Sequence, residues 1–238
     1  MSILNLFKKN IFLAASFFSS IFFAATLSAQ TLRDPRIPNG EHLVYQVTTG
    51  NVKSTTEVTT RTQREGGKDF YFVDSRSSNI DVFFKVERAS LLAVLTRTTQ
   101  RSKDGTVVRE TRLEDSRLQT KAGEIALVDF PALELALRGL DFEGQKSVKV
   151  HIAGTEADAP FSLVLHAAGK DTLKIGDKEW NCLKVQMSLS GIWSAVFPKT
   201  SFWLDTKEPH VLVKFEGQVG GPGTPRRVLE LVSVDQKP

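Results

Sequence analysis

The residues best suited to acid–base or metal chemistry are the four histidines, His42, His151, His166 and His210. Metal centres often take two ligands from one element, at spacings such as His-x-x-x-His. No two of these histidines have a ligand spacing, and the chain has no cofactor-binding motif. The sequence therefore predicts no metal site and no cofactor, and leaves only a site assembled in space from distant residues.

Two short motifs resemble catalytic or phosphate-binding loops, and both are rejected. The segment Gly191-Ile192-Trp193-Ser194-Ala195 lacks the second glycine and the strand-to-helix setting of a nucleophile elbow. The glycine-rich segment 220–223 lacks the lysine and the following helix of a phosphate loop. Serine, aspartate and histidine residues can be combined into a triad on paper in almost any chain. We therefore assign no catalytic residue from the sequence.

The remaining candidate is a binding site for an apolar ligand. It lies between Trp180 and Gly217, the stretch that holds all three tryptophans. If the sheet curls here, aromatic side chains on its concave face would line a cavity for an acyl chain or another apolar ligand. The alternative is that they form core, each contributing roughly 1.5 to 3 kcal/mol by burial. The candidate ligand-binding residues are Trp180, Trp193, Phe197, Phe202 and Trp203.

Alternation of apolar and polar residues predicts the strands that would position these side chains. The pattern is clear over 43–47, 80–87, 148–152, 183–190 and 211–216. The polar run from Asp205 to Pro209 predicts a turn, because aspartate can bond its own downstream backbone and proline cannot continue a ladder. Phe202-Trp203-Leu204 and 211–216 should therefore form a hairpin.

Further turns and one helix complete the pattern. Gly66-Gly67 predicts a turn, and Asp104-Gly105 predicts a hairpin between 91–101 and 106–118. The only good helix follows Pro131, with the apolar stripe Leu133, Ala136, Leu137 and Leu140. Within it Glu134 and Arg138 are spaced as an i, i+4 ion pair.

Two polar stretches allow both a purely structural and a functional interpretation. The threonine-rich segment 54–63 is predicted as an edge or solvated strand. Between Arg97 and Lys121 there are seven basic and four acidic residues. Interspersed acids favour a solvated sheet face with cross-strand ion pairs, and the alternative is a patch for anionic lipid or polysaccharide.

About ten to a dozen strands with one helix predict a mainly β fold. We expect one strongly curved antiparallel sheet, a half barrel or barrel-like, with the short helix closing one opening. A sandwich of two sheets is the other way to cover the apolar face.

Residues 1–29 have the pattern of a cleaved signal peptide. Lys8 and Lys9 precede an uncharged, mostly apolar run from Ile11 to Leu27, and small residues lead to Ala29. The alternative is an uncleaved membrane anchor, but serines interrupt a run already short for a bilayer crossing, which needs about 20 residues. We expect a periplasmic or extracellular product without a transmembrane segment, and a single domain over 30–238.

Net charge and cysteine content limit the classes of partner and the covalent cross-links that can be expected. Without the leader the formal net charge falls from +4 to +2, too small a bias to predict nucleic-acid binding. Cys182 is the only cysteine, so no internal disulfide can form. Its expected role is that of a small buried hydrophobe.

Several core and turn motifs resemble a family of exported bacterial domains of unknown function, whose members are similar to the curled half barrels of outer-membrane lipoprotein carriers. The resemblance spans nearly the whole mature chain, departs from the family pattern at Ser54, and implies a fold rather than an activity. It is carried by Gly40-Glu41-His42-Leu43-Val44-Tyr45, the helix 132–138 with Gly144, Phe202-Trp203-Leu204-Asp205 with Pro209, and Val213-Lys214-Phe215-Glu216.

Three classes of function follow. The first is an envelope protein that binds a hydrophobic or amphipathic ligand, or serves a lipoprotein or outer-membrane pathway, with lipid or lipoprotein as partner. The second is a structural or assembly factor that binds a protein through a sheet edge such as 54–63. The third is a hydrolase without a recognisable motif. A cavity near Trp193 and Phe197 would favour the first class. An exposed flat edge would favour the second, and a polar cleft that contains histidine with Asp, Glu or Ser would favour the third.

Overall fold

The computed structural model describes residues 32–112, 124–127, 132–142, 146–152, 161–190, 199–218 and 224–236. Within them the protein is mainly β, with one sheet of 13 strands and one short helix, α1 (Leu133–Arg138). The strands are β1 (Glu41–Thr49), β2 (Val52–Glu65), β3 (Lys68–Ser77), β4 (Ile80–Glu87), β5 (Ala93–Ser102), β6 (Gly105–Arg112), β7 (Ile125–Leu127), β8 (Ser147–Ile152), β9 (Phe161–Ile175), β10 (Lys178–Leu189), β11 (Thr200–Asp205), β12 (Leu212–Gln218) and β13 (Arg226–Asp235). The predicted leader lies outside these residues.

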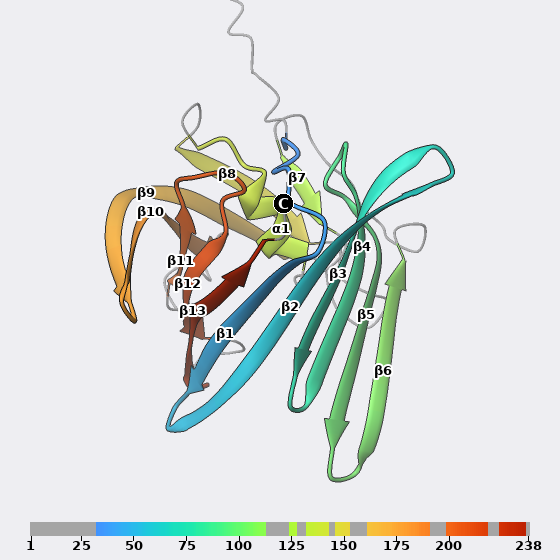
Figure 1. Cartoon of the computed structure of the whole chain (residues 1–238), viewed down its shortest axis with the longest axis horizontal. Coiled ribbons are helices and arrows are strands. Elements are labelled where there is room, and N and C mark those ends of the chain that lie inside the picture. Colours follow the sequence, from blue (N-terminus) through green and yellow to red (C-terminus); the bar gives the residue numbers. More distant parts are fainter. Residues whose placement is uncertain are drawn as a thin grey trace, which may run out of the picture.

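Strands that follow one another in the chain are mostly neighbours in the sheet. The order is β6-β5-β4-β3-β2-β1-β13-β12-β11-β10-β9-β8-β7, so β1 and β13 join two series of hairpins (Figure 1). Every pair is antiparallel except β7 and β8, which run parallel. The predicted mainly β fold with one sheet and one helix is therefore confirmed, with this single parallel pair as a departure.

The predicted hairpins agree with the observed register. Gly66 and Gly67 join β2 to β3 with φ angles of +57° and +81°, a backbone that other residues rarely adopt. Ser102 pairs with Gly105, so Lys103 and Asp104 form the turn between β5 and β6. The hairpin of β11 and β12 also forms, with Phe202 opposite Phe215. Residues 113–118 of the predicted β6 arm lie outside the described residues.

The prediction that 54–63 is an edge is wrong. These residues belong to β2, which pairs along its length with β1 on one side and β3 on the other. The strands at the two ends of the described sheet are β6 and β7. Threonine-rich composition indicates a strand but not its neighbours, and here Thr56 and Thr60 turn buried side chains toward the core.

Helix α1 packs its apolar side against the sheet. Figure 1 shows it between the β7–β9 end of the sheet and β1 to β4. Leu133, Leu135 and Leu137 are buried, as the apolar stripe predicts. The helix ends against Gly139, where an added Cβ would lie 2.2 Å from Leu91 Cδ1 and 2.4 Å from the Arg33 carbonyl oxygen. Only glycine fits this close approach.

The ion pairs of the outer surface match one of the two interpretations of the basic stretch. Arg97 bonds Glu110 on the neighbouring strand, and Arg101 bonds Asp81. These are the cross-strand pairs expected of a solvated sheet face. The part of that stretch after Arg112 lies outside the described residues, up to Lys121.

Candidate functional site

Two adjoining cavities lie between α1 and the sheet, with volumes of about 250 and 160 Å³. The larger is lined by residues of β1 to β4, β11 to β13 and α1. The smaller is lined by β2 to β4 and α1, and it shares Val58, Ser75, Val82 and Glu134 with the larger. Together they form the main cavity next to the helix.

Apolar side chains make the floor of the larger cavity. Phe202, Phe215 and Leu229 form one cross-strand row over β11, β12 and β13. The rings of Phe202 and Phe215 meet edge to face, with centroids 5.2 Å apart and planes at 62°. Alternation along each strand directs these side chains to the same face, where Leu133 of the helix also lines the cavity.

A buried ion pair fixes the helix end of the cavity. Arg138 donates to the two carboxylate oxygens of Glu41 at 2.7 and 2.9 Å, and its Nε donates to the Pro209 carbonyl at 2.8 Å. Both side chains are almost fully buried. Gln236 donates a further bond to Glu41 at 3.0 Å. This pairing replaces the predicted Glu134–Arg138 pair, because the helix presents Arg138 to β1 rather than along its own surface.

The same arginine keeps its charge despite burial. Burial by itself would lower the pKa of Arg138, but the hydrogen bonds and the charge of Glu41 raise that pKa above its ordinary value. A bidentate guanidinium–carboxylate pair is the arrangement in which buried charges are best tolerated. We interpret it as a structural clamp between α1 and β1.

Glu134 is the acidic group of the cavity itself, since it lines both parts of it. Its Oε1 lies 3.4 Å from the Tyr45 hydroxyl, which also donates to the Leu212 carbonyl at 3.0 Å. Burial raises the pKa of Glu134, and the charge of Arg138 only partly offsets this. The Tyr45 hydroxyl thus has two acceptors, of which the Leu212 carbonyl is the nearer and the Glu134 carboxyl the more distant.

Arg227 lines the other end of the larger cavity. It lies on β13 opposite Thr49, the last residue of β1, beside the turn that leads into β2. Burial lowers the pKa of Arg227, with no neighbouring charge acting against it. Its Nε is enclosed and has no hydrogen-bond partner among the described residues. The cavity thus has a carboxyl group at its helix end and an unpaired guanidinium at the opposite end.

The predicted ligand-binding aromatics are divided between the two faces. Phe202 lines the cavity. Trp203 follows it directly and therefore faces the other way, where Lys184 lies 4.9 Å from the ring centroid and Asp171 accepts a bond from the indole at 3.1 Å. Trp180 is buried with Lys178 over its ring. The ligand-binding role of these residues stays a prediction; its other two members, Trp193 and Phe197, lie outside the described residues.

Sequence reasoning missed Glu134, Tyr45 and Arg227 as cavity residues. One signal was available, because Arg227 alternates with Leu229 and Leu231 and so falls on the apolar face of its strand. A charge in that position is unusual unless it has a partner or a function. Glu134 gave no such signal, since an exposed helical acid has the same spacing.

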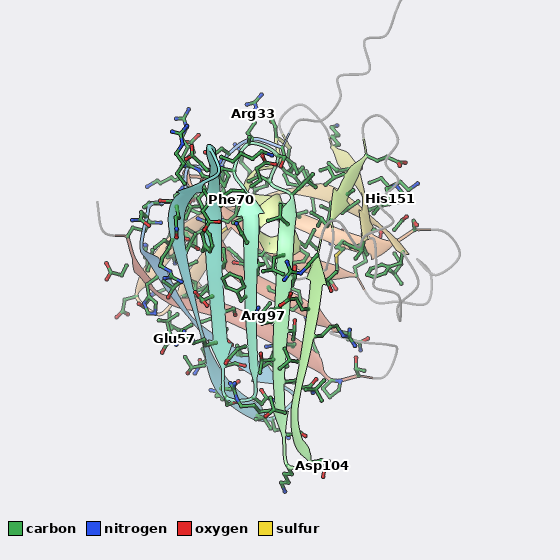
Figure 2. All side chains as sticks on the ribbon, turned by 90° about the vertical axis from the view of Figure 1, so that its right-hand side faces the viewer. Arg33, Glu57, Phe70, Arg97, Asp104 and His151 are labelled. Carbon is green, nitrogen blue, oxygen red and sulfur yellow. The ribbon has the colours of Figure 1, made fainter. Side chains whose placement is uncertain are left out.

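A second polar cluster joins Glu124, which directly precedes β7, to residues of β8 and β9. Glu124 Oε2 is 2.5 Å from His151 Nε2, and His151 Nδ1 is 2.8 Å from Ser162 Oγ. Hydrogen bonds from Lys149 and His151 lower the pKa of Glu124, although burial opposes them. His151 alternates with the buried Val150 and Ile152, so it points away from the core (Figure 2). The cluster contains a serine, a histidine and an acid in contact, away from the main cavity.

The other reactive groups are weaker candidates for a functional site. Burial raises the pKa of Cys182 to about 12, and the thiol is fully enclosed, which makes it inert at neutral pH. Among the described residues, no three side chains of the metal-ligating kinds gather at one point. No helix in the described part of the chain has the length and apolar character that a membrane crossing requires.

Comparison with known proteins finds likeness in structure only. No family model matches the chain, and no curated protein matches it in sequence. It is similar to a β-barrel-like protein of the domain of unknown function DUF1849 from Brucella abortus, with 12% identity, 84% of this chain and 98% of that chain covered, and a TM-score of 0.47.

Two further structures are similar over most of the chain. One is a protein inferred to be exported, with a YmcC-like fold, from Bacteroides fragilis, with 8% identity, 87% and 99% of the two chains covered, and a TM-score of 0.33. The other is a LolA superfamily protein from Nitrosomonas europaea, with 8% identity, 88% and 90% covered, and a TM-score of 0.22. The similar structures are thus a domain of unknown function, a protein inferred to be exported and a LolA superfamily protein.

Proposed function

We propose that the protein binds a hydrophobic or amphipathic ligand in the cavity beside α1, inside a sheet that curves around the helix as an open half barrel. The observation that carries the proposal is the lining of the larger cavity, which combines the apolar row of Phe202, Phe215 and Leu229 with a few polar groups. Small-molecule sites have this composition, apolar walls with a small number of placed polar side chains.

The lining also supports the curvature of the sheet. Residues from β4 to β11 border one cavity, although these strands are six steps apart in the strand order. At about 4.8 Å per step, a flat sheet would separate them by about 29 Å. A compact cavity of about 250 Å³ bordered by both strands supports a sheet that bends around it. An acyl chain or another slender apolar group would suit such a space.

The place of action in this proposal is the bacterial envelope. The leader predicted over residues 1–29 would export the chain. In the periplasm, lipids and lipid-modified proteins are the hydrophobic molecules that must be shielded from water. A role in a lipoprotein or outer-membrane pathway agrees with this setting.

The proposal is tested by gentle purification followed by mass spectrometry of extracted lipid, and by binding of the neutral fluorescent probe N-phenylnaphthylamine. We expect copurified lipid and enhanced probe fluorescence. Leu229→Trp fills the cavity and should abolish the enhancement, whereas Val232→Trp, at an exposed position on the same strand, should leave it unchanged. Absence of lipid together with equal probe signals from Leu229→Trp and the wild type would count against a ligand cavity.

A hydrolase is a second candidate, favoured by the contact of Glu124, His151 and Ser162. If this cluster activates the serine, a fluorophosphonate should label Ser162, and Ser162→Ala should lose the label. Ser147 offers a matched control, because its Oγ lies 3.0 Å from His166 Nδ1 in a comparable serine–histidine contact. Failure to label Ser162 would leave the cluster as an ordinary surface hydrogen-bond network.

A further inference from the structure

Arg227 occupies a position on the inner face that few charged residues take. It alternates along β13 with Leu229 and Leu231, and it lines a cavity whose floor is apolar. Among the described residues its guanidinium makes no hydrogen bond or ion pair, and its Nε is shielded from solvent. A guanidinium stays protonated in proteins, so the site holds a positive charge in all accessible conditions.

The acids of the neighbouring strands are already committed elsewhere. Arg226, adjacent in sequence but on the opposite face, pairs with Glu216, and Lys214 pairs with Glu230. Glu134 shares the cavity, but its electrostatic partners are Arg138, Glu41 and Tyr45 rather than Arg227. The described residues therefore supply no counter-charge for Arg227, and the side chains that share its cavity are mostly apolar or hydroxyl-bearing.

A half-buried charge without a partner lowers stability, because water that would solvate it is displaced and nothing replaces the lost interaction. Folded proteins keep such groups where a ligand completes them. Thr56 adds a second incomplete group, since its Oγ1 is buried with no hydrogen-bond partner in the described part of the chain and the residue lines the same cavity. An acceptor-rich anion would satisfy the guanidinium and the hydroxyl alike.

We infer that the ligand is an anionic amphiphile, whose carboxylate or phosphate head binds Arg227 at the end of the cavity away from α1. This inference rests on the proposed function and adds the chemical class of the ligand. The alkyl chain would lie along Leu229, Phe215 and Phe202 toward the helix. The orientation follows from the register, because Arg227 pairs with Thr49 at the end of β1, whereas Leu133 and Glu134 close the other end.

Glu134 fits the same orientation. Its raised pKa favours the neutral carboxyl, which interacts with Tyr45 and places little negative charge next to an incoming chain. A negatively charged head is attracted by the Arg227 guanidinium, whereas at the helix end the positive charge of Arg138 is already paired with Glu41. The two ends of the cavity therefore differ in the part of the ligand that they accept, the charged head at Arg227 and the alkyl chain at the helix.

The test measures displacement of N-phenylnaphthylamine by octanoate, octyl phosphate and octanol, which share one chain length and differ in the head. A charge-assisted hydrogen bond contributes about 1.5 to 3 kcal/mol, which corresponds to roughly tenfold to a hundredfold in affinity. We expect one or both anions to bind the wild type at least about tenfold more tightly than octanol, with the stronger anion identifying a carboxylate or a phosphate head.

Substitutions at the adjacent arginines separate a specific contact from a general charge effect. Arg227→Gln should reduce anion affinity to that of octanol, and Arg227→Lys should restore part of the difference. Arg226→Gln removes one positive charge on the outer face and should leave the anion preference unchanged. Circular dichroism and probe binding confirm that each variant is folded with an open cavity.

The outcomes distinguish the two proposals. If the probe and all three competitors fail to bind, the proposed function is wrong. If the probe and octanol bind while neither anion is preferred, or if Arg227→Gln retains the preference, the cavity is real and the anionic class is wrong. Equal losses in Arg226→Gln and Arg227→Gln would attribute the preference to net charge and likewise overturn the role of Arg227.

Discussion

Two arginines at the ends of one cavity have opposite surroundings. Arg138 is almost completely buried and gives its guanidinium to Glu41 and to the Pro209 carbonyl, with Gln236 completing the carboxylate. Arg227 is half-buried, lines a cavity with an apolar floor and has no partner within the described residues. Arg138 thus belongs to a complete ion pair, whereas Arg227 carries a charge with no counter-charge among the described residues.

This difference teaches how to separate structural charges from candidate binding groups. A buried pair whose hydrogen bonds are all made has no capacity left for a ligand, and its removal should act on folding. An unpaired charge beside a cavity contributes little to the fold, and its removal should act on binding. Each of the following predictions tests one side of this contrast.

The largest effect is expected from Arg138→Met. The variant leaves Glu41 buried without its partner, which should lower the free energy of unfolding by about 3 to 5 kcal/mol. Urea denaturation followed by tryptophan fluorescence measures the change. A matched control is the double variant Glu41→Leu with Arg138→Met, which removes both charges and should recover most of the loss. A single variant as stable as the wild type would show that the pair is not a clamp.

Gly139→Ala should have the next largest effect, because it disturbs the attachment of the same helix. The added Cβ would collide with Leu91 Cδ1 and with the Arg33 carbonyl oxygen, and the backbone atom cannot move without shifting its segment. Overpacking of this kind lowers the free energy of unfolding by about 1 to 3 kcal/mol. Thermal denaturation measures it, and Gly176→Ala, at a turn with φ of +59° and open space, gives a comparison for backbone strain without collision.

Glu134→Gln tests the group that faces the cavity between Tyr45, Arg138 and Glu41. Because burial raises the pKa of Glu134, its contribution to stability is fully present below the ordinary pKa of 4.5 and is lost as the pH rises through the folded-state value. Glutamine has no proton to lose and keeps an oxygen that accepts from Tyr45. The variant should therefore be more stable than the wild type at neutral pH.

The check is a series of urea midpoints for both proteins between acid and neutral pH. The advantage of Glu134→Gln should shrink as the pH falls and vanish below about 4.5. An advantage that is the same at every pH would place its origin in packing rather than in the carboxyl proton. Asp81→Asn on the outer surface supplies a control of opposite sign, because the hydrogen bond of Arg101 lowers the pKa of Asp81.

The fold could be predicted from the sequence to a large extent, because its signals are local. Alternation located β1, β4, β8 and β12, the Gly66-Gly67 and Asp104-Gly105 pairs located turns, and one apolar stripe located α1. Pairing partners were less accessible. The threonine-rich β2 has two neighbours rather than one, and the parallel β7–β8 pair joins segments that carry no mark of their direction.

The candidate site could be predicted only in part, because it depends on contacts between distant segments. Phe202 and Trp203 were predicted together, although strand alternation directs adjacent side chains to opposite faces, and only the structure shows that Phe202 is the one on the cavity side. The pairing of Arg138 with Glu41 joins residues 97 positions apart and outweighs the nearby Glu134. Spacing rules describe neighbours along an element, whereas the clamp and the cavity arise between elements.

Arg227→Gln should have the smallest effect on stability, in contrast with Arg138→Met. The substitution removes a charge that burial disfavours and breaks no bond seen among the described residues, so the free energy of unfolding should stay within about 0.5 kcal/mol of the wild type or rise. Urea denaturation without added amphiphile measures it, with Arg226→Gln as the control. A loss of several kcal/mol would reveal a structural partner for Arg227. It would also remove the distinction between the two arginines, because both would then be required for folding.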